Sequence, residues 1–295
     1  MSKAKIALLS AGEMGGAIAQ ALTSAGWSVA TDISGRGAET RERASAAGMQ
    51  LREGLEAMLA DCDLYFSILP PSRAYANAQA VAEVARRTGR AVTFVECNAI
   101  SPKLCAEIAA LFEGGPVKFV DAGIIGMPPG TAKPRLYISG PDCAALLATD
   151  GIAYDIRPLG PEIGRASGMK MTYASMTKGV NALLTAAFLT ADRLDLLDEL
   201  VAEFSASQGQ LYARAASNIA RLPADAGRWA YEMEQIAQTY SDAGLPDGFH
   251  QGAAAIMRLL DASEYGDETR RTRDKSRTAE ATIRAVAADI GKTPR

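Results

Sequence analysis

The chain has 295 residues, which is enough for a large core and for two domains. Its formal net charge is −3, from 31 Lys and Arg against 34 Asp and Glu, so no excess of positive charge points to nucleic acid as a partner. No apolar run reaches the length of a membrane span, and no charged-then-apolar leader precedes the first apolar run. We therefore expect neither a membrane anchor nor a signal peptide.

The four cysteines and the single histidine limit which metal sites, disulfides and catalytic mechanisms the chain can contain. The four cysteines lack the paired spacing of metal sites and are too few for a disulfide framework; they are Cys62, Cys97, Cys105 and Cys143. This usage favours a reduced, cytoplasmic setting. His250 is the only histidine, so a multi-histidine metal site is excluded and we expect no metal. A Ser–His–Asp hydrolase would depend on that one residue.

The chain opens with a predicted strand, turn and helix. An apolar run over 5–9 precedes a glycine-bearing turn, and an Ala-rich stretch then continues to Gly26 without a helix breaker. The N-terminus of such a helix points free backbone N–H groups at whatever lies over the turn. Gly12 would let the backbone approach a pyrophosphate, and Gly15 would let the helix pack closely on the strand. Ser10 stands where the usual dinucleotide fingerprint has a glycine. The residues of the turn that we expect to bind a dinucleotide are Gly12, Glu13, Met14 and Gly15.

Strands and helices alternate through the next hundred residues. Further strands are predicted over 27–32, 62–69, 91–96, 117–121 and 135–139. Helices are predicted over 39–47 and 73–87, and another begins at Pro102 with Ser101 as its N-cap. This alternation is typical of an α/β domain with a doubly wound parallel sheet and helices on both faces.

The pattern changes near Gly160, and no strand is predicted from Glu162 to the end. Long helices are predicted over 164–192, 194–220, 226–243, 248–263 and 278–290, and the charge-dense stretch over 267–273 is interpreted as a solvated face. We therefore divide the chain into a dinucleotide-binding domain over residues 1–161 and an all-helical domain over 162–295 that binds substrate and dimerises.

Four segments, in this order, resemble the β-hydroxyacid dehydrogenase superfamily, which includes 3-hydroxyisobutyrate and 6-phosphogluconate dehydrogenases. They are the opening turn, Glu96–Pro102, Phe119–Gly126 and Gly164–Lys170. In the C-terminal half, segments 228–234, 244–246 and 248–250 resemble a bacterial subgroup with a phosphogluconate-dehydrogenase-like C-terminal domain of unknown function. The resemblance runs from Lys5 to about Leu260. It implies a Rossmann domain, a long interdomain helix and an all-α C-terminal domain.

The resemblance also implies a nicotinamide cofactor, NAD or NADP. Leu69 and Pro70 resemble the loop that lies along this cofactor, and Asn98 resembles a residue near the nicotinamide. Asn98 could instead only cap a turn, but its place at the C-terminal end of a strand favours contact with a ligand.

Two features disagree about which dinucleotide is bound. Asp32, 20 residues after Gly12, would hold the ribose hydroxyls and repel a 2′-phosphate. Ser34 and Arg36, however, resemble the clamp of phosphate-preferring relatives, and the guanidinium could bind a phosphate bidentately. The balance favours NADP slightly.

The segment ending at Lys170 resembles the family's Gly-x-Gly-x-x-x-Lys motif, with Ala166 for the second glycine, and this resemblance implies that Lys170 is the catalytic lysine. Its neighbours are small and apolar, and burial among them would lower its pKa towards neutrality. The family's Asn one turn later is absent. Tyr173, three residues on, is expected to supply its hydrogen bond.

The substrate side departs from the family. The motif Asp-Ala-Pro-Val-Ser-Gly-Gly, a loop that holds the substrate carboxylate, corresponds to 121–127, with glycine for proline and isoleucine for serine. Backbone N–H groups of this loop could still bind an anion, beside a more apolar wall. Tyr231 and Glu232 stand where the hydroxyacid enzymes of the family have a Lys-Asp pair that holds the substrate acid. His250 either packs at its helix start or covers the pocket, including from a partner subunit. The expected substrate-binding residues are Gly123, Ile124, Ile125, Gly126, Tyr231 and His250.

Together these resemblances imply an NAD(P)-dependent oxidoreductase acting on CH–OH groups. Hydride would move between the nicotinamide and a small-molecule alcohol or hydroxyacid, or its carbonyl partner, with Lys170 as general acid/base in a homodimer. Two alternatives stay open: an imine reductase on the same fold, and a non-catalytic dinucleotide-binding protein. The departures at Ser10, Ile125, Tyr173 and Tyr231 favour the last of these.

Overall fold

The computed structural model describes residues 3–9, 11–130 and 132–291. Its contacts divide the chain into two compact units, Met1–Met171 (unit 1) and Thr172–Arg295 (unit 2), with the boundary inside the helix α7 (Arg165–Arg193). The sequence-based division between 161 and 162 stays a prediction about domains. No helix in the described part of the chain is both long and apolar enough to cross a membrane.

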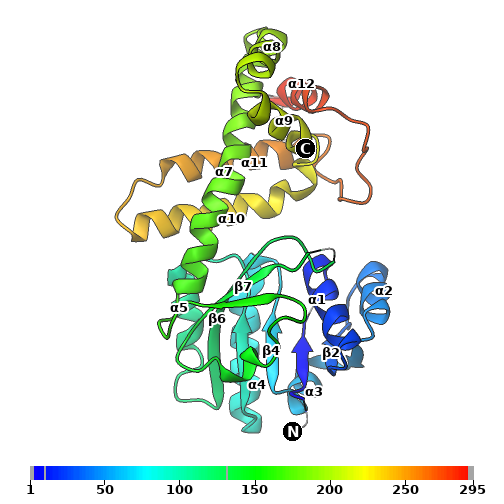
Figure 1. The fold of residues 1–295 in the computed structure, drawn as a ribbon, viewed down its shortest axis with the longest axis vertical. Coiled ribbons are helices and arrows are strands. Elements are labelled where there is room, and N and C mark those ends of the chain that lie inside the picture. Colours follow the sequence, from blue (N-terminus) through cyan, green and yellow to red (C-terminus); the bar gives the residue numbers. More distant parts are fainter. Residues whose placement is uncertain (1–2, 10, 131, 292–295) are drawn as a thin grey trace. The chain divides into compact units, whose positions relative to one another are not determined.

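Unit 1 contains one eight-stranded sheet in the order β3-β2-β1-β4-β5-β6-β7-β8 (Figure 1). The strands are β1 (Ile6–Leu8), β2 (Val29–Asp32), β3 (Gln50–Arg52), β4 (Leu64–Ser67), β5 (Val92–Glu96), β6 (Val117–Ile125), β7 (Arg135–Ser139) and β8 (Asp155–Pro158). Neighbouring strands are parallel except for β6 and β7. The predicted doubly wound α/β fold is therefore confirmed.

The expectation of an all-parallel sheet is wrong at β7, which runs antiparallel to β6. The described residues of the connection between them, 126–130 and 132–134, include no helix, and a parallel partner would need a longer crossover. β6 also continues to Ile125, beyond the predicted end at 121. Gly123, Ile124 and Ile125, expected in a loop, are therefore strand residues that pair with β7.

The helices of unit 1 lie between the strands along the chain. They are α1 (Glu13–Ser24), α2 (Ala38–Ala46), α3 (Gly54–Ala60), the 3₁₀ turn η1 (Pro71–Arg73), α4 (Ala74–Thr88), α5 (Pro102–Ala110) and α6 (Ala144–Leu147). The cap predicted for α5 is confirmed, since the Leu104 N–H donates to Ser101 Oγ at 3.2 Å. β3, α3, α6 and β8 were not predicted, because each is short and both unpredicted strands lie at sheet edges with exposed or polar residues.

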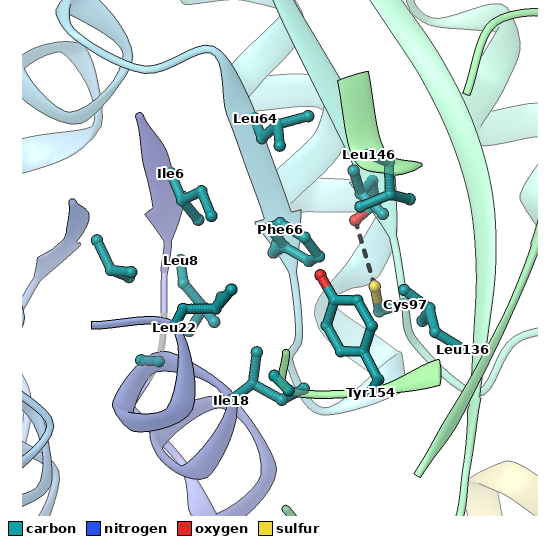
Figure 2. Packing of buried hydrophobic residues seen from close by; sticks show 14 of the residues in the cluster. Ile6, Leu8, Ile18, Leu22, Leu64, Phe66, Cys97, Leu136, Leu146 and Tyr154 are labelled. Atoms are coloured by element: carbon teal, nitrogen blue, oxygen red, sulfur yellow. Dashed lines mark hydrogen bonds between the residues drawn. The ribbon is translucent and has the colours of Figure 1, made fainter. Parts of the chain in front are cut away.

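The sheet carries an apolar core on each face. On one face Ile6, Leu8 and Phe66 pack with Ile18 and Leu22 of α1 and with Tyr154 (Figure 2). On the other face Tyr65 and Phe94 stack with ring centroids 5.4 Å apart, and Phe119 joins the same cluster. Adjacent residues such as 65 and 66 point to opposite faces, as strand geometry requires. Both layers of helices thereby fix the strand ends that carry the site.

Unit 2 is built from helices. After α7 come α8 (Leu197–Ser207), α9 (Gly209–Ile219), α10 (Pro223–Asp242), α11 (Gly248–Asp261) and α12 (Ala279–Asp289). The described residues of this unit include no strand, as predicted. The predicted helix over 194–220 is wrong: the chain leaves α7 through Asp195 at φ 55°, and Gln208, at φ −134° and ψ 44°, separates α8 from α9. α10 and α11 lie side by side as a hairpin (Figure 1).

Candidate functional site

The carboxyl ends of four parallel strands bring the expected cofactor residues to one edge of the sheet. Asp32 ends β2, Gly12 follows β1, Leu69 follows β4 and Asn98 follows β5. In space these strands are neighbours in the order β2-β1-β4-β5, and the crossover direction changes between β1 and β4. In open α/β sheets such a switch point is where ligands bind.

The turn between β1 and α1 can receive an anion. Gly12 is the N-cap of α1, with φ −64° and ψ −177°. Because it has no side chain, it makes no side-chain hydrogen bond that would cap the helix. The first N–H groups of a helix have no acceptor inside the helix and carry partial positive charge, and Met14 and Gly15 lie in this first turn of α1. This backbone fits a diphosphate. Ser10, the departure from the glycine fingerprint, lies outside the described residues.

The loop after β2 carries both of the groups that disagree about the cofactor. Asp32 Oδ1 accepts a 2.8 Å hydrogen bond from the Ser34 N–H. Partial burial raises the pKa of Asp32, but hydrogen bonds from Ser34 and Gly54 and the charge of Arg36 outweigh it, so the pKa lies below its usual value. Asp32 is thus a carboxylate at neutral pH. Among the described residues no hydrogen bond to the Arg36 guanidinium is found, whereas neighbouring Arg43 is paired with Glu39.

Asn98 lies between the loops that follow β4 and β5. Its side chain is 4% exposed; Oδ1 accepts from Leu69 N–H at 2.6 Å, and Nδ2 donates to Ser67 Oγ at 2.9 Å. Both ends of the carboxamide therefore join the two loops. Leu69 and the exposed Pro70 are the parts of this edge open to a ligand, held in place by Asn98.

Glu96 is a feature of this edge that sequence reasoning missed. Its carboxyl is buried at the end of β5; Oε1 accepts from the Asn98 N–H at 2.8 Å, and Oε2 has no hydrogen-bond partner in the described structure. Burial raises the pKa of Glu96 to about 8, against smaller opposing effects of hydrogen bonds from Asn98 and Ser67. The acidic residue before the turn at Asn98 was visible in the sequence, but its burial was not.

Lys170 lies in the second turn of α7, within unit 1. Its Nζ donates a 2.6 Å hydrogen bond to the carbonyl oxygen of Ile124 on β6. The Ile124 side chain belongs to the core of the sheet, so this residue offers its backbone rather than its side chain to the lysine. An ammonium group has three donors, and this bond orients the group at the end of β6.

Asp121 was left without a role by the sequence, and the structure gives it one. It is fully buried on β6, and its carboxylate accepts hydrogen bonds from the backbone at the start of α7 and from two serine hydroxyls. The signal available in the sequence was an acidic residue inside an otherwise apolar strand.

Gly126, just beyond β6, has φ +135°, and a Cβ there would lie 3.0 Å from Pro134 Cα, so glycine is required.

The remaining predicted site residues lie in unit 2, on three helices. Tyr173 on α7 is 43% exposed, and Tyr231 on α10 is half-buried, with a pKa raised by burial. His250 on α11 is 4% exposed and packs against Tyr240 with ring centroids 4.3 Å apart. Burial lowers the pKa of His250, with Asp247 opposing, so it is neutral at pH 7. His250 thus packs within the α10–α11 hairpin, and its buried Nδ1 has no hydrogen-bond partner among the described residues. Its contact with substrate stays a prediction.

Glu232, beside Tyr231, has a structural partner. Its carboxylate is 2% exposed and pairs with Lys178 on α7 and, at 2.5 Å, with Arg228. The described residues contain no group of three or more His, Cys, Asp or Glu able to hold a metal ion.

Comparison with known families finds two matches, one in each half of the chain. Residues 5–146 match the NAD binding domain of 6-phosphogluconate dehydrogenase, and residues 191–260 match a domain of unknown function, DUF1932.

Three solved structures are similar over nearly the whole chain. The conserved protein MTH1747, of unknown function and with structural similarity to 3-hydroxyacid dehydrogenases, is 27% identical, with a TM-score of 0.62 over 87% of this chain and 96% of its own. Mycobacterium tuberculosis 3-hydroxyisobutyrate dehydrogenase with L-serine is 19% identical, with a TM-score of 0.69 over 98% and 100%. Aspergillus terreus reductive aminase with NADPH4, cyclohexanone and allyl amine is 18% identical, with a TM-score of 0.53 over 96% and 99%. The last two likenesses concern the fold alone.

A nicotinamide-dinucleotide-binding domain of this type is joined here to the helical domain of the subgroup that the C-terminal segments resemble. These matches support the β-hydroxyacid dehydrogenase superfamily and an NAD(P)-dependent oxidoreductase.

Proposed function

We propose that this oxidoreductase interconverts a small alcohol or hydroxyacid and its carbonyl partner, with Lys170 as the general acid/base. The observation that carries the proposal is the 2.6 Å hydrogen bond from Lys170 Nζ to Ile124 O, which orients an ammonium group within the same unit as the dinucleotide-binding edge. A bound nicotinamide supplies or accepts the hydride. The protein must then hold the substrate and move one proton at its oxygen.

Each part of the edge has a task in this scheme. The amides of Met14 and Gly15 and the turn at Gly12 bind the pyrophosphate. Asp32 accepts a hydrogen bond from the 3′-hydroxyl of the adenosine ribose, the one that a 2′-phosphate leaves free, and Leu69 and Pro70 line the cofactor. Asn98 positions that loop rather than touching the ligand, since its carboxamide is already bonded.

We propose NADP as the preferred form. Arg36 and Ser34 stand beside Asp32 in the same loop, and the Arg36 guanidinium is available to a phosphate, whereas Arg41 donates to the Arg36 carbonyl and Arg43 pairs with Glu39.

Lys170 donates its proton to the carbonyl oxygen during reduction and takes it back from the hydroxyl during oxidation. The groups that bind the substrate carboxylate in the family are fewer in this chain. The backbone of 123–125 is part of a strand paired with β7, and Glu232 is held by Lys178 and Arg228. These features favour a substrate with little negative charge. Gly126, in the same unit as Lys170, remains a proposed contributor to its pocket. For Tyr173, Tyr231 and His250, which lie in unit 2, substrate contact stays a prediction from the sequence.

The test begins with fluorescence titration of the wild type with NADPH and NADH, where we expect the tighter dissociation constant for NADPH. A screen of hydroxyacids, alcohols and carbonyls then identifies turnover. Lys170→Ala should lower kcat by roughly 10²–10⁴ while the NADPH dissociation constant stays within about threefold of the wild type. Lys118→Ala, which removes a surface ion pair with Asp142, is the matched control. A Lys170→Ala rate near that of the control would refute the proposed role.

An imine reductase is the second candidate, favoured by the fold shared with the reductive aminase. Cyclic imines and amine–ketone pairs belong in the same screen, and turnover of these alone would select it. Tight NADPH binding without turnover of any substrate class would instead favour the non-catalytic alternative.

A further inference from the structure

The first turn of α7 is held by one buried carboxylate. Asp121 Oδ2 accepts hydrogen bonds from the backbone N–H groups of Gly164 at 2.9 Å, Ala166 at 3.0 Å and Ser167 at 3.1 Å. The hydroxyl of Ser139 donates to Oδ2 at 2.9 Å, and that of Ser167 donates to Oδ1 at 2.6 Å. A buried carboxylate needs such donors, and a helix N-terminus stabilises its negative charge. The position of the helix along its axis is thereby tied to β6.

Gly123, two residues further along β6, sets how closely the helix approaches the strand. A Cβ at this position would lie 2.8 Å from the carbonyl oxygen of Ala166 and 3.0 Å from Lys170 Cβ. Contacts that short force atoms apart, and the nearer one is to backbone, which cannot rotate away. Asp121 and Gly123 lie on the same face of β6, because strand residues alternate and these are two apart.

We propose that Asp121 and Gly123 are positioning residues that together place Lys170 Nζ on the Ile124 carbonyl. Ala166 and Ser167, which Asp121 holds, precede Lys170 by about one turn of a rigid helix, so a shift of the first turn is carried to the lysine. Gly123 touches the Cβ of that lysine, and Ile124, the next residue, provides its acceptor. The catalytic meaning of this placement rests on the proposed function, but the placement can be measured without any substrate.

The experiment measures the acylation of individual lysines with sulfo-N-hydroxysuccinimide acetate from pH 6 to 10, read by mass spectrometry. The variants are Asp121→Asn and Gly123→Ala. Their controls are Asp142→Asn, an exposed acid paired with Lys118, and Gly130→Ala, where the nearest atom to a Cβ is at 3.9 Å. Exposed Lys133 is the internal reference.

We expect the rate at Lys170, relative to Lys133, to rise at least about fivefold in both variants and the pH of half-maximal rate to shift, with neither control changing. A merely structural role would lower the melting temperature and leave the Lys170 profile as in the wild type. Should Asp121→Asn fail to fold, Ser139→Ala removes one donor and also the second acceptor of the Ala166 N–H, and it is expected to raise the rate in the same direction. Lys170 rates within twofold of the wild type in the folded variants would overturn the proposal.

With a substrate in hand, kcat of Gly123→Ala should fall by about 10- to 100-fold with the NADPH dissociation constant unchanged, because displacing a reacting group by about 1 Å has that effect. A failure of the proposed function has a different outcome: Lys170→Ala would retain kcat while the acylation changes in the positioning variants persist.

Discussion

A fully buried carboxyl group with one unpaired oxygen is unusual, and Glu96 has both properties at the end of β5. Its neighbour across the β5–β6 pair is Asp121, the carboxylate that holds α7. Ionising both would place two negative charges side by side inside the sheet, and the larger effect, burial, already disfavours the charge on Glu96. Glu96 is therefore protonated at neutral pH and holds the Asn98 N–H as a neutral acid.

This arrangement predicts a pH-dependent stability. Burial raises the pKa of Glu96 to about 8 in the folded protein, above its ordinary value of 4.5, so the folded state retains a proton that the unfolded state releases. The free energy of unfolding should then fall as the pH rises from about 4.5 through about 8, by at most about 5 kcal/mol. Glu96→Gln removes this dependence. In urea unfolding, the free energy of unfolding of the variant should therefore rise relative to that of the wild type between pH 5 and 8.5. Glu83→Gln, on the exposed face of α4, is the control, and wild-type and Glu96→Gln curves that stay parallel across this range would contradict the prediction.

The residues of the cofactor edge were predictable, but several of their tasks were not. Gly12, Asp32 and Asn98 follow strands in the sequence, and strand ends meet at one edge. The tasks of Glu96 and Asp121 depend on burial and on donors from distant segments, such as the start of α7, some 45 residues after Asp121. A sequence pattern contains no information about which buried donors will surround a carboxylate.

At the level of elements, α10 is joined to α7 by a buried ion pair. Glu232 receives Lys178 from α7, and the ammonium of Lys178 lies 5.1 Å from the centre of the Trp229 ring. Removing one partner of a buried pair leaves the other charge uncompensated. Glu232→Gln should therefore lower the free energy of unfolding by about 3 kcal/mol, measured by urea denaturation. Glu234→Gln, which breaks the more exposed pair with Arg258, should cost less than about 1 kcal/mol, and equal costs would contradict the assignment.

The boundaries of elements were predicted well for long helices with a sustained apolar periodicity. They were predicted poorly for short edge strands and for a break between two helices. Helices α7, α10 and α11 begin and end within a few residues of the prediction. The break at Gln208 lies beside Gly209, a breaker signal that the prediction of one helix over 194–220 did not use. β8 contains Arg157 and Pro158 and carries no local strand signal. The antiparallel direction of β7 follows from the short connection between β6 and β7. The sequence-based prediction located the strands but did not use the length of that connection to predict their direction.

For the whole molecule, we expect a homodimer formed through unit 2. Large apolar side chains stay exposed on its described surface, among them Met176 (66%), Leu183 (55%) and Phe249 (52%). Patches of this kind often mark interfaces between subunits. Light scattering after size-exclusion chromatography should give twice the 31.0 kDa of one chain, and Leu183→Glu should shift the mass towards a single chain. Leu51→Glu, on edge strand β3, is the control; a wild-type mass of one chain at micromolar concentration would refute the expectation.

The bond between Asn98 and Leu69 has a consequence for ligand affinity. A free loop loses about 1–2 kcal/mol of conformational entropy per residue when a ligand orders its backbone. Here the Asn98 carboxamide already fixes the loop after β4, so that ordering takes place when the chain folds. The edge of the sheet is preorganised, and the contacts it makes with a dinucleotide contribute to affinity with little loss to ordering the protein.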